Sequence, residues 1–169
     1  TTDSIGQRDH DGVRCLVFDD STLPKTGRYI EKVSRVWDHV LNRCILGYKL
    51  LVMGYWDGTS FLPLDFSLHR EKGKNADKPY GLKKKEYRKQ YRKKREKGTH
   101  AWDRAMEADG TKIDSAVRMF WRAITQGVKV DYVLMDSWFT MPATVVTLAQ
   151  HLQVIGMVKK SSRIHYTFN

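Results

Sequence analysis

The chain has 169 residues, of which 41% are hydrophobic, and its aromatic residues supply enough apolar surface for a core of ordinary domain size. No stretch approaches the roughly 18 consecutive apolar residues of a membrane-spanning helix, and the N-terminus lacks the pattern of a secretory signal. Composition therefore argues against a membrane protein and predicts a soluble, cytoplasmic one. Cys15 and Cys44 show neither a CxxC spacing nor a paired histidine cluster, so neither a disulfide framework nor a zinc finger is indicated.

The first predicted element is a buried strand at residues 14–20, RCLVFDD, which follows a polar, glycine-containing loop at residues 1–12. Its β-branched and aromatic residues and its short length favour a strand over a helix. The strand would carry two adjacent carboxylates, Asp19 and Asp20, at its C-terminal end. Pro and Gly in STLPKTG, residues 21–27, then predict a loop.

A β-hairpin is predicted next. Two apolar stretches, residues 45–55 and 60–68, flank the sequence WDGT at residues 56–59. Asp-Gly between hydrophobic runs is a strong hairpin signal. Together with the first strand, this hairpin would form a three-stranded meander.

Helices and strands alternate in the second half of the chain. TKIDSAVRMFWRAITQ, residues 111–126, places its apolar residues on one helical face. VKVDYVLMD, residues 128–136, predicts a short strand, Pro142 opens a second helix, and VIGMV at residues 154–158 predicts a last strand. The order β-β-β-α-β-α-β predicts an α/β fold, a mixed sheet with helices on its faces.

A basic insertion, at about residues 73–100, separates the hairpin from the first of these helices. Residues 83–97 contain ten basic and two acidic residues, which is +8 of the net charge of +11. Such a segment must lie in water, as a partly helical linker from Leu82 onward, or against a polyanion. Tyr87 and Tyr91 offer ring faces beside the cations, which favours nucleic-acid contact. The predicted phosphate-binding residues are Lys83, Lys84, Lys85, Arg88, Lys89, Arg92, Lys93, Lys94 and Arg95, together with Lys25 and Arg28 in the loop after the first strand.

Two separate apolar strands end on an aspartate, at Asp20 and at Asp136. Carboxylates at the ends of neighbouring strands can converge, and Mg²⁺ prefers oxygen ligands, so the pair suits metal-assisted phosphoryl transfer. The competing interpretation is that each aspartate only begins a turn. Asp19 is the weaker candidate, because neighbouring strand residues point to opposite faces. Trp138 and Phe139 are expected to be core residues rather than DNA-stacking ones.

At these residues the chain resembles a known family. LVFDDSTLPKTG and DYVLMDSWFT are similar to the first and second catalytic blocks of bacterial insertion-sequence DDE transposases, the IS-four group and its relatives, and the likeness covers most of residues 14–160. The resemblance implies an RNase H-like catalytic domain that cuts and rejoins DNA with Mg²⁺ or Mn²⁺. Asp20, directly before Ser21, would be the first catalytic metal ligand and Asp136 the second. It also implies transposon ends and target DNA as partners, self-association in a transposition complex, and a location with the bacterial nucleoid.

The third catalytic residue of that family, a glutamate on a late helix, has no counterpart here. Residues 137–169 contain no Asp or Glu. The sequence therefore predicts one partial RNase H-like domain at residues 1–169, with its C-terminal part missing and with little or no strand-cleaving activity alone. Two alternatives stay open: a truncated transposase that binds DNA or the full-length enzyme and inhibits transposition, and a basic nucleic-acid-binding protein with no transposase history.

Overall fold

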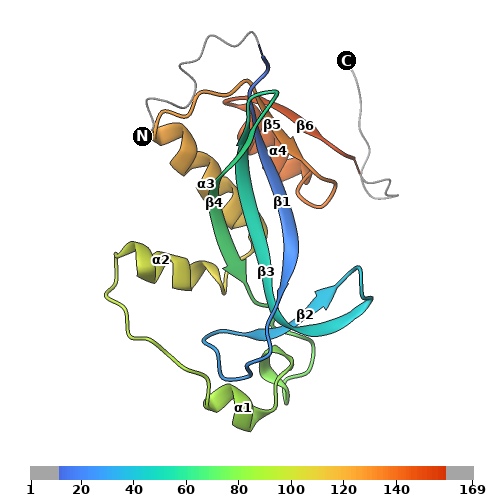
Figure 1. The fold of residues 1–169 in the computed structure, drawn as a ribbon, viewed down its shortest axis with the longest axis vertical. Coiled ribbons are helices and arrows are strands. Elements are labelled where there is room, and N and C mark those ends of the chain that lie inside the picture. The colour runs from blue at the N-terminus through green and yellow to red at the C-terminus, as the bar shows by residue number, and fades with distance from the viewer. Residues whose placement is uncertain (1–11, 159–169) are drawn as a thin grey trace. The chain divides into compact units, whose positions relative to one another are not determined.

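A computed structural model describes residues 12–158, so most of the predicted N-terminal loop lies outside the described residues. Figure 1 shows the elements in chain order. The strands are β1 (Cys15–Pro24), β2 (Ser34–Asp38), β3 (Arg43–Trp56), β4 (Phe61–His69), β5 (Tyr132–Met135) and β6 (Gln153–Gly156). The helices are the 3-10 turn η1 (Pro79–Gly81), α1 (Lys84–Arg88), α2 (His100–Glu107), α3 (Lys112–Thr125) and α4 (Pro142–Ala149).

The strands form one mixed sheet of six. They hydrogen-bond in the order β2-β3-β1-β5-β6, and β4 pairs with β3 outside this path. β1 and β5 are parallel, as are β5 and β6, whereas β2 and β3 are antiparallel. The predicted α/β class and the β-β-β-α-β-α-β order are confirmed, with β2, η1, α1 and α2 added as insertions.

Two compact units make up the described chain. The first contains residues 12–19, 53–64 and 117–158, and the second contains residues 20–52 and 65–116. Several long elements, among them β1, β3 and α3, run from one unit into the other. The interpretation of residues 1–169 as one partial domain stays a prediction.

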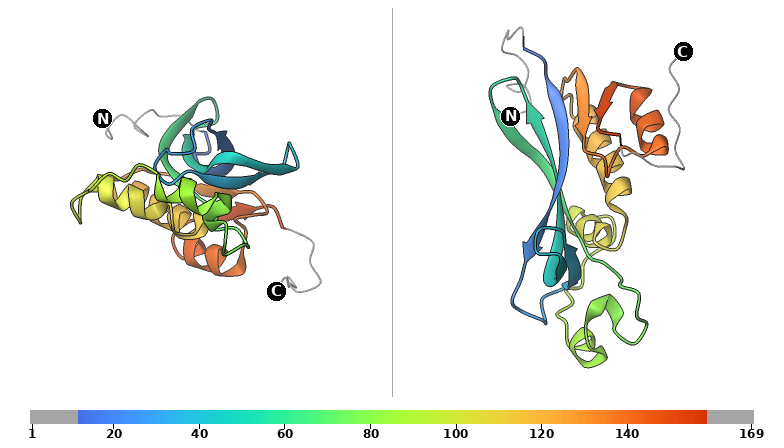
Figure 2. Two further views of the ribbon diagram at one scale, coloured as in Figure 1. Left: turned by 90° about the horizontal axis from the view of Figure 1, so that it is seen from below. Right: turned by 90° about the vertical axis from the view of Figure 1, so that its right-hand side faces the viewer.

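The core of the first unit contains apolar residues from strands and helices. The β1–β5 register runs from Cys15↔Tyr132 to Phe18↔Met135, and the β5–β6 register ends at Met135↔Gly156. Figure 2 shows α4, in orange, beside β6, with which it packs. The buried apolar side chains of this unit include Leu16, Phe18, Met53, Met119, Phe120, Val133, Met135, Phe139 and Leu148. Those of α3 recur at helical spacing, which is why the sequence pattern predicts this helix correctly.

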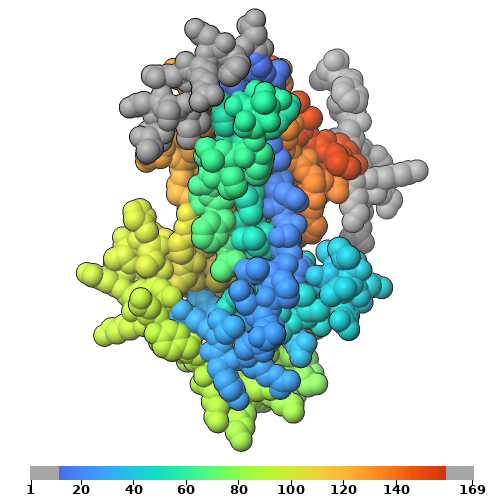
Figure 3. Space-filling view, in the orientation of Figure 1, coloured from blue at the N-terminus to red at the C-terminus, as the bar shows by residue number. Residues whose placement is uncertain are grey.

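The core of the second unit includes residues of the basic insertion. Val33, Leu46, Tyr48 and Leu82 form a buried cluster, and partly buried side chains pack against it. Gln90 is also buried, and its Nε2 donates to the carbonyl of Val33 at 2.7 Å. The insertion is therefore built into this unit. By contrast, the β2–β3 turn exposes apolar side chains to solvent, in cyan at the right of Figure 3.

The first strand is longer than predicted. β1 continues to Pro24, so the predicted loop at residues 21–27 is wrong over its first half, and Asp20 lies within the strand rather than at its end. Close packing against β3 explains the difference: a Cβ on Gly47 would lie 2.3 Å from the carbonyl oxygen of Leu23. Pairing along this stretch outweighs the local turn signal, and the strand ends at Pro24.

Candidate functional site

Asp136 follows β5 directly and opens a tight turn. Its Oδ1 accepts the backbone N–H groups of Trp138 at 3.0 Å and Phe139 at 3.3 Å. Its backbone carbonyl accepts the N–H of Thr140 at 3.2 Å and the Thr140 hydroxyl at 2.7 Å. Asp136 thus opens a turn, and these bonds also orient its carboxylate, whose Oδ2 takes no part in them.

Gly156 permits the close approach of this turn to β6. A Cβ at Gly156 would lie 2.5 Å from Oγ1 of Thr140, which is itself buried. We expect Gly156→Ala to destabilise the protein by about 1–3 kcal/mol, because the added methyl group overpacks the site. Urea denaturation measures this effect, with the exposed neighbour Ile155→Val as control. Equal unfolding free energies for Gly156→Ala and the control would contradict it.

The two aromatic residues after Asp136 differ in burial. Phe139 is fully buried, as predicted for a core residue. Trp138 is 47% exposed, so the same prediction is wrong for it. The two rings meet edge to face, with their centroids 5.4 Å apart, so Trp138 covers Phe139 on its solvent side.

Asp20 forms an ion pair in the second unit. Its Oδ2 lies 2.7 Å from Nζ of Lys112, and the two side chains are only 15% and 13% exposed. Lys112 is the first residue of α3, where the helix dipole disfavours a cation. The carboxylate of Asp20 offsets that cost. No sequence signal could have identified this pair, since 92 positions separate the two residues.

A buried polar cluster lies close enough to this ion pair for both charges to act on His69. His69 and Ser67 of β4 and Glu107 of α2 are all buried. Nδ1 of His69 lies 3.3 Å from the carbonyl of Gly110 and Nε2 lies 2.6 Å from the hydroxyl of Ser67. Because a carbonyl can only accept, Nδ1 carries a proton. In the neutral ring, which burial favours, Nε2 then accepts from the Ser67 hydroxyl.

Burial lowers the pKa of His69, while its bond to Gly110 and the carboxylates of Glu107 and Asp20 act in the opposite direction. Because the folded-state pKa is depressed, the neutral ring stabilises the protein fully above the unfolded pKa of about 6.5, and this stability is lost as the pH falls. We expect His69→Gln to flatten the decrease in unfolding free energy below about pH 6.5. Urea denaturation at several pH values tests this, with exposed His39→Gln as control. An unchanged slope in His69→Gln would contradict the assignment.

The structure places the predicted metal ligands in different units. Phe18 and Met135 are register partners in parallel strands, and Asp19 and Asp136 directly follow them in the first unit. Asp20 is the next residue of β1 and belongs to the second unit. Asp19 is exposed, whereas Asp20 is largely shielded. Among residues 12–158, no group of three or more His, Cys, Asp and Glu side chains is arranged to hold a metal ion.

Within the basic segment, residues 83–97, only α1 has regular secondary structure, and the segment is tied to the second unit. α1 ends at Arg88, so the predicted helix is short and Tyr91 lies beyond it. Arg95 forms a two-pronged ion pair with Glu31, at 2.8 and 2.6 Å, and the backbone N–H of Tyr91 donates to the carbonyl of Tyr29. These contacts argue against a loose solvated linker.

Three of the predicted phosphate-binding residues already pair with carboxylates. Arg95 pairs with Glu31, Arg28 with Glu86 at 2.6 Å, and Lys84 with Asp77 at 2.8 Å. The ion pairs of the described residues include none of the other predicted contacts, which are Lys25, Lys83, Lys85, Arg88, Lys89, Arg92, Lys93 and Lys94. All of these except the partly buried Lys25 are exposed.

The strand and helix order, the mixed sheet and the aspartates on β1 and after β5 define an RNase H-like α/β protein. The chain matches the sequence profile of the DDE superfamily endonucleases over residues 6–169, and it belongs to this family. Neither a curated protein nor a solved structure matches the chain. The predicted DDE relationship is confirmed, whereas the assignment to the IS-four group stays a prediction.

Membership of this family assigns a nuclease type of function with DNA as the substrate, in a superfamily that generally depends on divalent metal ions. No helix within residues 12–158 combines the length and apolar character needed to cross a membrane.

Proposed function

We propose that this chain is part of a DNA transposase, in which Asp20 and Asp136 are the catalytic residues that bind Mg²⁺ or Mn²⁺. One observation carries the proposal: β1 and β5 are parallel neighbours with Phe18 opposite Met135, so Asp136 directly follows a strand that pairs with the strand carrying Asp20. Transposon ends and target DNA would be the substrates. Self-association in a transposition complex and a location with the bacterial nucleoid belong to the same proposal.

The side chains of this pair fit such ions. Both supply only carboxylate oxygen, the ligand type that these hard cations prefer. The ammonium of Lys112 lies 2.7 Å from Oδ2 of Asp20, so the protein already stabilises a positive charge beside this carboxylate. The turn after β5 fixes Asp136 through its Oδ1. When bound, divalent ions would activate the attacking oxygen and stabilise the leaving one.

We also propose that this chain alone does not cut DNA. Two carboxylates leave a metal pair with fewer protein ligands than the family's three, and residues 137–169 add none. A nicking assay tests this proposal: supercoiled plasmid is incubated with the chain and Mn²⁺, and cleavage would convert it to the relaxed form. We expect the plasmid to stay supercoiled. Nicking by the 169-residue chain that disappears in Asp136→Ala would contradict the proposal of inactivity and support the metal site.

A second candidate function is inhibition of a complete transposase. The combination of a missing third carboxylate with a folded, basic segment supports it, because such a chain could retain DNA without cutting it. Co-expression with the complete enzyme is expected to reduce the transposition frequency. An unchanged frequency would count against inhibition.

We propose that exposed cations on α1, and Lys89 directly after it, contact DNA phosphates. We expect replacement of Lys85, Arg88 and Lys89 with alanine to reduce the slope of log K against log salt by about 2–3, since each phosphate contact contributes about 0.9. Titration of duplex DNA at four salt concentrations measures the slope. Exposed Lys129→Ala serves as control, and equal slopes for the triple variant and the unmodified chain would show that these residues only face solvent.

A further inference from the structure

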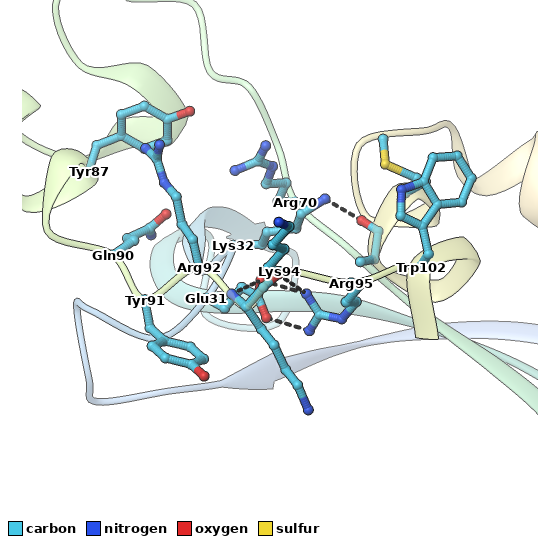
Figure 4. Close-up of a pocket in the computed structure, with 13 residues that line it drawn as sticks. Glu31, Lys32, Arg70, Tyr87, Gln90, Tyr91, Arg92, Lys94, Arg95 and Trp102 are labelled. Carbon is cyan, nitrogen blue, oxygen red and sulfur yellow. Dashed lines mark hydrogen bonds and ion pairs between the residues drawn. The ribbon is translucent and has the colours of Figure 1, made fainter. Parts of the chain in front are cut away.

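The second unit contains a cleft that the proposed catalytic residues do not use. Its volume is 390 Å³, within the usual range for pockets that hold small ligands. The walls come from the loop around Glu31, the end of the basic segment and α2, as Figure 4 shows. Six of the lining side chains are cationic: Lys32, Arg70, Arg92, Lys93, Lys94 and Arg95.

The acidic groups in and beside this cleft are neutralised. Glu31 is the one carboxylate that lines it, and the paired guanidinium of Arg95 is the main reason that its pKa lies below the ordinary range. Asp109, which lies outside the lining, pairs with Lys32 at 2.7 Å and also with Arg70. Burial raises the pKa of Asp109, but these two cations outweigh it and lower the pKa.

Three cations of the cleft are left for a ligand. Among the ion pairs of residues 12–158, none includes Arg92, Lys93 or Lys94. All three are exposed, and the guanidinium of Arg92 lies 5.5 Å from the ring centre of Tyr87. The cleft therefore presents a net positive lining and selects an anion.

Aromatic rings stand beside these cations, on backbone that is held by hydrogen bonds. Tyr91 is 63% exposed, and its backbone is held by the carbonyl of Tyr29 at 2.8 Å. Trp102 is partly exposed in the first turn of α2, where Thr99 caps the helix by accepting the N–H of Trp102 at 3.3 Å. Figure 4 shows Tyr91 and Trp102 on opposite sides of Lys94 and Arg95. A ligand with both an anionic and a flat apolar part fits this arrangement.

We propose that the cleft binds an unpaired nucleotide of single-stranded DNA, with its phosphates on Arg92, Lys93 and Lys94 and its base against Tyr91 or Trp102. Base faces are hidden in a duplex, so rings beside phosphate-binding side chains are useful only to a strand with unstacked bases. An acidic peptide would use the cations but not the rings. The inference rests on the proposed function, because it takes DNA as the partner. It adds that the DNA is single-stranded and that it binds in this cleft.

Fluorescence anisotropy with a labelled 12-residue oligothymidylate and a duplex of equal length tests the inference on the full chain. Loss of the ring that stacks on the base, by Tyr91→Ala or by Trp102→Ala, is expected to weaken binding of the single strand by about 5- to 100-fold, and both variants are expected to leave duplex binding unchanged. Tyr91→Phe keeps the ring and should retain affinity. Trp37→Ala removes a partly exposed ring elsewhere in the same unit and should have no effect.

The outcomes separate this inference from the proposed function. If both alanine variants bind the single strand as tightly as the unmodified chain, and unfold at the same temperature as Tyr91→Phe, the cleft is not the binding site. Salt-dependent binding of the duplex would then still support DNA as the partner. Polyglutamate serves as a competitor that carries charge but no bases. If it displaces the labelled oligonucleotide as effectively as unlabelled oligothymidylate, the cleft recognises charge alone, and the inference is overturned. Absence of binding to either DNA form would overturn both.

Discussion

In the complete transposase, Asp20→Ala and Asp136→Ala are each expected to reduce DNA strand cleavage by at least about 10³-fold while DNA binding persists. Metal ions contribute several kcal/mol to transition-state stabilisation in phosphoryl transfer, and each 1.4 kcal/mol corresponds to about tenfold in rate. Single-turnover cleavage of a labelled transposon end measures the rate, and anisotropy on the same DNA measures binding.

Asp19 provides the sharpest control for this result. It is exposed, neighbours Asp20 in β1, and differs from it in the direction of its side chain. We expect Asp19→Ala to retain cleavage. Loss of cleavage in Asp19→Ala together with normal activity in Asp20→Ala would transfer the role to Asp19. Normal strand transfer by both Asp20→Ala and Asp136→Ala would reject the assignment.

Lys112→Met is expected to destabilise the metal-free protein by about 2–4 kcal/mol. Removing one partner of a buried ion pair costs about 3–5 kcal/mol, and the 15% and 13% exposure of these side chains reduces that cost somewhat. Because a bound divalent ion supplies positive charge beside Asp20, Mn²⁺ should stabilise the variant more than the unmodified chain. Urea denaturation in EDTA and in excess Mn²⁺ measures both effects.

Lys129→Met is the matched control. Because Lys129 is exposed, its loss should change neither the unfolding free energy in EDTA nor the stabilisation by Mn²⁺. Direct titration of Mn²⁺ by electron paramagnetic resonance should show tighter binding to Lys112→Met, where the ion no longer competes with an ammonium group. Equal stabilisation of both chains by Mn²⁺ would mean that the ion binds away from Asp20, and the metal assignment would fail for this residue.

Local sequence signals determined the hairpin and the regular elements from α3 onward. Asp57 and Gly58 predict the turn between β3 and β4, and in the structure Oδ1 of Asp57 accepts the N–H groups of Thr59 and Ser60 while Gly58 adopts a φ of 94°. α3 lies at Lys112–Thr125, against a predicted helix at residues 111–126. Such signals are sufficient because their partners lie within a few residues of one another.

Tertiary contacts decided how Asp20 and the basic segment are placed. The sequence block predicts a role for Asp20, but its position within β1 and its pairing with Lys112 depend on residues that are distant along the chain. The path of the basic segment depends on Glu31, 64 positions from Arg95. Composition could predict that this segment is cationic, yet a charge count carries no information on which cations are neutralised by distant carboxylates. The sequence by itself therefore determined the family and the element order, whereas long-range pairing decided which carboxylates and cations are available for function.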